Sequence, residues 1–100
     1  MFLYVMASTP AGPCKLGYSA DPKKRLKQLQ TGYPEELHLY HVEETPDFRI
    51  MEGLIHAENR HRRLSGEWYD LSVEDAIVEI KHALIRYEDS AELKARKKHF

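Results

Sequence analysis

Two runs of strand-forming residues open the hydrophobic pattern of this chain. Positions 2–6 are aromatic, aliphatic or β-branched, and positions 14–18 form a second run. The loop between them, residues 8–13, contains two prolines and a glycine. Strand-forming runs separated by such a loop are typical of a β-hairpin. The pattern therefore predicts two antiparallel strands.

A third strand is predicted over residues 37–42, where side chains alternate with a period near two. Successive strand residues point to opposite faces. We therefore expect Leu37, Leu39 and His41 on one face and the residues between them on the other. Residues 67–71 form a further short extended segment.

Two helices are predicted on either side of the third strand. Asp21, followed by a proline, has the chemistry of an N-cap, and good helix formers occupy residues 23–30. Thr45, also followed by a proline, is the expected cap of a second helix that runs from about 46 to about 62. Apolar residues recur there at three- and four-residue spacing, which is typical of a helix with one buried face.

A third helix is expected after Ser72, which forms a capping-box-like start with Asp75. Its buried stripe is expected to consist of Ala76, Ile77, Ile80, Ala83, Leu84 and Tyr87. Three strands and three helices in this order predict an α+β fold. We expect a small, three-stranded, mainly antiparallel sheet flanked by helices.

Length and composition limit the class of protein. The 100 residues, 42% of them hydrophobic, suffice for one domain. We expect that domain at residues 1–88, with a basic C-terminal extension at 89–100. Cys14 is the only cysteine and no signal peptide is recognisable, so we expect a cytoplasmic protein. No apolar run is long enough to predict a membrane span.

Positive charge is clustered although the formal net charge is only -1. Most of the basic residues fall into three groups: Lys15, Lys23, Lys24, Arg25 and Lys27; Arg60, Arg62 and Arg63; and Lys94, Arg96, Lys97 and Lys98. Such groups can form a face that attracts phosphate. The alternative is that they are ordinary solvated helix surfaces.

The histidines do not predict a zinc site. His38 and His41 are three apart on a predicted strand and point to opposite faces, and His61 is out of line with His56 on the predicted helix. Glu52, however, lies one helical turn before His56. A carboxylate next to an imidazole can hold a divalent ion, although most such pairs are surface contacts.

Several short motifs resemble those of one nuclease family. Phe2-Leu3-Tyr4 and Lys15-Leu16-Gly17 are about ten residues apart, and Arg25 follows Gly17 by eight positions. The second predicted helix contains Glu52-Gly53-Leu54-Ile55-His56. In this order the motifs resemble the GIY-YIG nuclease superfamily, with Phe2 in place of the first glycine and Lys15 in place of the second tyrosine.

The closing segment Gly66-Glu67-Trp68-Tyr69-Asp70-Leu71 is similar to the GEW(F/Y)xL signature of the phage-type and meiotically up-regulated gene 113 branch. The resemblance covers residues 2–80. It implies a GIY-YIG-like fold and a metal-dependent endonuclease that hydrolyses phosphodiester bonds in DNA. Tyr18, Trp68 and Tyr69 are expected to be packing residues.

The resemblance implies roles for four catalytic residues. Glu52 would anchor Mg²⁺ (or Mn²⁺), with Glu58 as the competing ligand. Arg25 would bind the non-bridging phosphate oxygens. Tyr4 would be the general base or would orient the attacking water. Lys15 is the candidate cation that would favour the phenolate form of Tyr4.

DNA is the expected partner, and a protein partner is expected to supply specificity. The nucleic-acid-binding residues are expected to be Lys23, Lys24, Lys27, Arg60, Arg62 and Arg63. Two alternatives stay open, a non-catalytic nucleic-acid-binding module with the same fold and a protein-interaction domain. Divalent-ion-dependent cleavage would distinguish the endonuclease, and salt-dependent binding without cleavage would favour the binding module.

Overall fold

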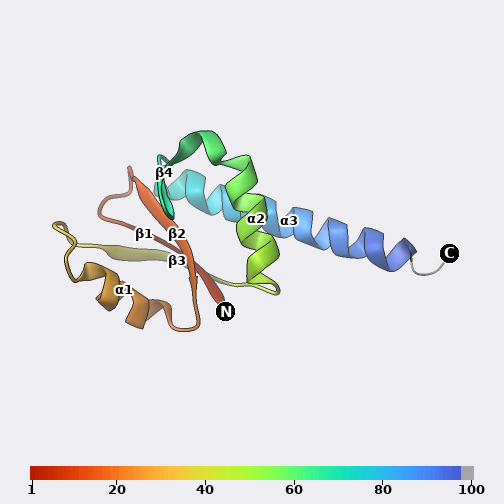
Figure 1. Ribbon diagram of the computed structural model, residues 1–100, viewed down its shortest axis with the longest axis horizontal. Helices are drawn as coiled ribbons and strands as arrows, with labels where there is room; N and C mark the ends of the chain where they lie inside the picture. Colours follow the sequence, from red (N-terminus) through yellow and green to blue (C-terminus); the bar gives the residue numbers. More distant parts are fainter. Residues whose placement is uncertain (98–100) are drawn as a thin grey trace.

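The computed structural model describes residues 1–97 and contains one antiparallel sheet of five strands in the order β3-β1-β2-β5-β4 (Figure 1). The strands are β1 (Phe2–Ala7), β2 (Cys14–Ser19), β3 (His38–Glu44), β4 (Arg63–Ser65) and β5 (Trp68–Tyr69). The α+β class agrees with the prediction. Within these residues no helix is long and apolar enough to cross a membrane.

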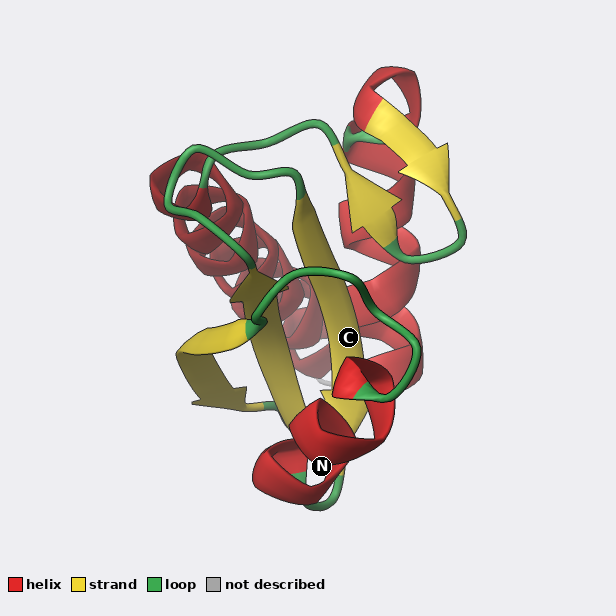
Figure 2. Cartoon of the chain, turned by 90° about the vertical axis from the view of Figure 1, so that its left-hand side faces the viewer, coloured by secondary structure: helices red, strands yellow, loops and turns green. Residues whose placement is uncertain are grey.

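The predicted number of three strands is wrong because β4 and β5 add to the free edge of β2. They form a short hairpin, visible at one edge of the sheet in Figure 2, and Gly66 turns it with φ +56°. Cys14 and Lys15 pair with Tyr69 and Trp68. Strands of two and three residues are too short to produce an alternating pattern, and their pairing is long-range.

The helix α1 (Pro22–Gln30) confirms the predicted cap, because the backbone N–H of Lys24 donates to Asp21 Oδ1 at 3.1 Å. The start predicted for the second helix is wrong. The helix α2 (Phe48–Glu58) is capped by Asp47, which accepts from the N–H groups of Arg49 and Ile50. Thr45 lies three residues before the first helical residue, and its N–H donates to Met1 O, which extends the strand pairing.

The second helix also ends earlier than predicted. Asn59 follows α2, and its side-chain amide donates to Ile55 O at 3.0 Å, so it competes with helix continuation. The chain then makes the 3-10 turn η1 (Arg60–Arg62) and enters β4. The region expected to be one helix therefore contains the helix α2 and the tight turn η1, and β4 begins directly after it.

The third helix, α3 (Val73–Lys97), confirms the predicted start and buried stripe. The N–H of Asp75 donates to Ser72 Oγ at 3.1 Å. Ala76, Ile80 and Ala83 are buried in the core, and the other three stripe residues pack against it. The helix continues without a break past residue 88, where we expected the extension to begin. Lys98 lies outside the described residues.

The sheet separates α1 from α2 and α3 (Figure 1). Leu3 and Val5 oppose Tyr18 and Leu16 across the β1–β2 pair, so all four side chains share the face covered by α2 and α3. That face holds the main hydrophobic core. The residues between them, which include Tyr4, point to the face covered by α1.

A β-bulge in β3 overturns one predicted face. Val5 pairs with His41 and Met6 with Leu39, so Tyr40 is an extra residue on β3. The extra residue places Leu39 and His41 on opposite faces, although strict alternation predicted that they would share one. Tyr40 is partly buried and packs against the hydrophobic core.

Candidate active site

Tyr4 is fully buried, with 0% of its surface exposed, and lies opposite Gly17 in the β1–β2 pair. A Cβ added at Gly17 would lie 2.6 Å from both Glu67 Oε2 and Tyr4 Cζ, and closer still to the Tyr4 hydroxyl. Glycine therefore leaves the space in which the tyrosine and the carboxylate meet. This is the role of the second half-motif's glycine in this chain.

The pKa of Tyr4 is raised from its ordinary value of 10.0, chiefly by burial. A hydrogen bond and the positive charge of Arg25 lower the pKa, while Glu67 raises it through its charge and a hydrogen bond. Tyr4 is therefore a neutral phenol near pH 7. The cation beside it is Arg25 of α1, which is half-buried against the sheet.

Lys15 points to the same face as Tyr4, but its ammonium group is engaged elsewhere. Its Nζ lies 3.7 Å from Glu67 Oε2 and 5.5 Å from the ring centroid of Trp68. Tyr33 stacks on Trp68 with centroids 5.3 Å apart and an interplanar angle of 8°. Trp68 thus packs between secondary-structure elements, as expected, and Lys15 completes that packing.

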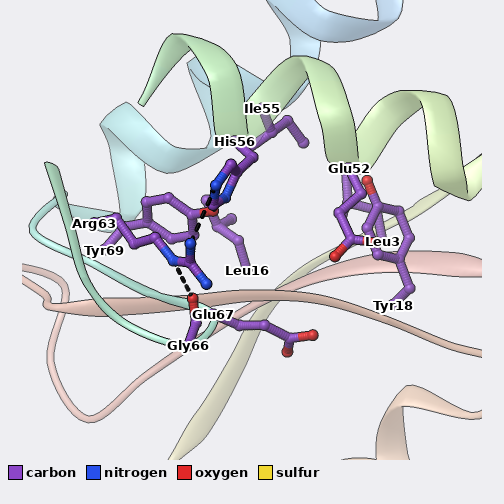
Figure 3. A pocket seen from close by; sticks show the side chains of 10 residues that line it. All are labelled: Leu3, Leu16, Tyr18, Glu52, Ile55, His56, Arg63, Gly66, Glu67 and Tyr69. Carbon is purple, nitrogen blue, oxygen red and sulfur yellow. Dashed lines mark hydrogen bonds between the residues drawn. The ribbon is translucent and has the colours of Figure 1, made fainter. Parts of the chain in front are cut away.

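A pocket of about 140 Å³ lies between α2, the edge of β2 and the β4–β5 turn (Figure 3). Its lining residues are Leu3, Leu16, Tyr18, Glu52, Ile55, His56, Arg63, Gly66, Glu67 and Tyr69. Tyr4 and Arg25 do not line it. Glu67 therefore belongs both to the pocket and to the contact with Tyr4 at Gly17.

Two tyrosines face the carboxylates of this pocket. The Tyr18 hydroxyl is buried and has no hydrogen-bond partner within the described structure. Burial and, next, Glu52 raise the pKa of Tyr18. Burial also raises the pKa of Tyr69, Arg63 opposes the rise, and Glu52 and Glu67 add to it. Tyr18 packs on Phe48, as expected for a packing residue, but it also presents its hydroxyl to the site.

Arg63, His56 and Tyr69 form a hydrogen-bonded wall of the pocket, drawn with dashed lines in Figure 3. Arg63 Nε donates to Gly66 O at 2.7 Å, and Nη1 lies 3.1 Å from His56 Nε2. Because arginine only donates, Nε2 accepts and the ring proton is on Nδ1. Nδ1 then donates to Tyr69 Oη across 3.5 Å.

A family model, the T5orf172 domain, matches residues 1–84. The chain belongs to the T5orf172 domain family. This is a GIY-YIG-like, nuclease-associated domain family, which agrees at that level with the resemblance seen in the motifs. No curated protein and no solved structure matches the chain.

The basic residues of this T5orf172 domain lie in separate places. Lys23, Lys24 and Lys27 are exposed on α1. Arg60 and Arg62 lie in η1, just before β4, and Figure 1 shows this segment well apart from α1. Arg63 is exposed, but it is bonded into the pocket wall. The expected nucleic-acid-binding residues therefore do not form one group around α1.

The pocket's donor atoms fit a hard divalent cation. Glu52 is exposed on α2 and forms no ion pair with any described residue, whereas Glu58, the competing ligand, pairs with Arg86. The unpartnered Tyr18 hydroxyl adds another oxygen donor beside Glu52. Mg²⁺ accepts one or two carboxylates and keeps several waters. No cluster of three or more His, Cys, Asp or Glu residues occurs in the described part of the chain.

Sequence reasoning missed Glu67 as a site residue. The sequence places Glu67 only within the closing signature, because nothing local reveals which residue a short hairpin brings beside Gly17. Both residues lie in recognisable motifs, Glu67 in the closing signature and Gly17 in the second half-motif. Only the tertiary pairing of β5 with β2 brings these two motifs together.

Proposed function

We propose that this T5orf172 domain is a metal-dependent endonuclease that hydrolyses phosphodiester bonds in DNA. The observation that carries the proposal is the position of Glu67. One side chain contacts the Tyr4–Arg25 pair and also lines the pocket that contains Glu52. Glu67 therefore links the Glu52 carboxylate of the pocket with Tyr4 and the Arg25 guanidinium beside it, and a carboxylate anchor, a guanidinium and a proton-accepting group are the parts that phosphodiester hydrolysis requires.

Glu52 is the proposed anchor for Mg²⁺ or Mn²⁺. The ion, when bound, would neutralise charge on the phosphate and activate or stabilise the oxygens of the displacement. Arg25 is the proposed donor to the non-bridging phosphate oxygens, for which the planar guanidinium is well suited. Lys15 supports the site indirectly, because it pairs with Glu67.

DNA is the proposed substrate, held by phosphate contacts from the exposed lysines of α1 and the arginines of η1. These groups are separated, so they would contact different parts of the DNA backbone. Specificity would come from a protein partner, and the place of action would be the cytoplasm. The segment at residues 66–71 supports placement in the phage-type and meiotically up-regulated gene 113 branch.

The test is conversion of supercoiled plasmid to nicked or linear DNA with Mg²⁺, Mn²⁺ or EDTA. Wild-type protein is compared with Glu52→Gln and with Glu36→Gln, which removes the same charge from an exposed loop position. We expect metal-dependent cleavage by wild type and Glu36→Gln, and its loss in Glu52→Gln. Cleavage by none of them, with DNA binding that weakens as salt rises, would instead support the non-catalytic binding module.

A further inference from the structure

Hydrogen bonds to the backbone carbonyls of Glu67 and of the preceding Gly66 fix the position of Glu67. The N–H of Leu16 donates to Glu67 O at 3.0 Å, which fixes the turn against the edge of β2. The carbonyl of Gly66 accepts from Arg63 Nε at 2.7 Å. The backbone therefore enters the site at a defined position, and the side chain reaches over Gly17.

Tyr4 and Glu67 differ sharply in their access to water. Tyr4 is 0% exposed, whereas 43% of the Glu67 side chain is exposed. A general base must come within hydrogen-bond distance of the water from which it takes a proton. Glu67 meets this requirement at the mouth of the pocket, and Tyr4 beneath it does not.

We propose that Glu67 is the general base for the attacking water and that Tyr4 is a positioning residue that donates its hydroxyl hydrogen bond to the Glu67 carboxylate. This inference rests on the proposed function. It reverses the role that the family resemblance gave to Tyr4. The raised pKa of Tyr4 agrees with it, because a neutral phenol donates a hydrogen bond and a phenolate does not.

The proposed step balances in atoms and charge. Glu67 takes one proton from water as the water oxygen forms its bond to phosphorus. The phosphorus–oxygen bond to the leaving sugar oxygen breaks, and that oxygen takes a proton from solvent. Glu67, which is partly exposed, then returns its proton to solvent.

Charged groups from four elements face Glu67. Lys15 of β2 is 3.7 Å away, and Arg25 of α1 acts through Tyr4. Within the pocket the neighbouring groups are Glu52 and His56 of α2, Arg63 of β4, and the hydroxyls of Tyr18 and Tyr69. The effect of a substitution at Glu67 on the cleavage rate is therefore compared with the effect of a substitution at its neighbour Tyr4.

The experiment compares single-turnover plasmid cleavage by the full chain and by Glu67→Gln, Glu67→Asp and Tyr4→Phe, from about pH 6 to pH 9 and over a range of Mn²⁺ concentrations. Glutamine keeps the shape and an acceptor oxygen for the Tyr4 hydroxyl, so we expect the fold to persist. Thermal unfolding and DNA binding in EDTA check this for each variant. Glu36→Gln is again the charge control.

We expect Glu67→Gln to lower the maximal rate by about 100-fold or more at every pH tested. Tyr4→Phe should lose only about ten-fold, because it removes one hydrogen bond to a charged group. Glu67→Asp should recover part of the lost rate.

Three results would overturn the inference. Wild-type rates and pH profile in Glu67→Gln would exclude Glu67 as the base while leaving the nuclease intact. A loss that saturating Mn²⁺ restores would make Glu67 a metal ligand. A greater loss in Tyr4→Phe than in Glu67→Gln would return the role of base to Tyr4. If wild type does not cleave at all, the proposed function itself fails.

Discussion

Gly17→Ala is the substitution that most directly tests the geometry of the site. An alanine Cβ at this position would lie 2.6 Å from Glu67 Oε2 and from Tyr4 Cζ, about 0.8 Å short of the 3.4 Å at which ordinary contact begins. Tyr4 is fully buried in the sheet, so its ring has little room to move. The partly exposed carboxylate of Glu67 is the group that would be displaced.

Displacing the Glu67 carboxylate should lower the free energy of unfolding, and it should lower the cleavage rate more strongly. Overpacking a buried site typically costs about 1–3 kcal/mol. For a chain of this length each kcal/mol lowers Tm by about 4–8 °C. Moving a catalytic carboxylate by nearly 1 Å can lower the rate by about 100-fold. Gly17→Ala should therefore lose much more activity than its loss of stability would explain.

The assay pairs thermal unfolding with single-turnover plasmid cleavage well below Tm. Gly53→Ala is the matched control, because a Cβ there meets no atom of the described residues within 4 Å and the residue lies within α2. It should raise the free energy of unfolding by about 0.4–1 kcal/mol and leave cleavage unchanged. Wild-type Tm and rate in Gly17→Ala would refute the close approach of Tyr4 and Glu67.

Three further predictions concern the caps, the thiol and the cations. Asp47→Ala should lower the free energy of unfolding by about 1 kcal/mol. Thr45→Val removes a buried hydroxyl that has no partner among the described residues, so it should not lower the free energy of unfolding; chemical denaturation measures both. Burial raises the pKa of the Cys14 thiol from 9.0 to about 11, so it should resist a thiol reagent at neutral pH until the chain unfolds. Folding favours the neutral thiol, so its contribution to the free energy of unfolding is complete below pH 9.0 and should fall by about 1.4 kcal/mol per pH unit up to pH 11. Rapid labelling of Cys14 in the folded protein would contradict the predicted resistance to the thiol reagent. Arg25→Ala should reduce cleavage more than Lys27→Ala, since only Arg25 contacts Tyr4, and equal losses would mean that general charge alone matters.

Interactions between residues close in sequence were predicted well. The first hairpin, the Asp21 cap and the buried stripe of α3 all follow from patterns within one strand or helix. Tyr4, Lys15 and Gly17 share one face of the sheet, because β1 and β2 pair through a short loop without a bulge. Arg25 follows on the next helix and needed only a correct helix start.

Long-range pairing decided the rest. One extra residue in β3 reversed the relation between Leu39 and His41, and an alternating pattern cannot reveal such a bulge. The helix predicted to begin after Thr45 begins instead after Asp47, and Thr45 extends the pairing of β3 with Met1, a residue distant in sequence.

The candidate site shows the same division between local and tertiary information. The amino-acid sequence by itself determined which polar residues are available and on which strand or helix each lies. Only the tertiary structure brought Glu67 over Gly17, buried Tyr4 beneath it and opened Glu67 to the pocket. The physical reason is that β5 has two residues, so its place at the edge of β2 depends on contacts made by the folded chain and not on its own pattern.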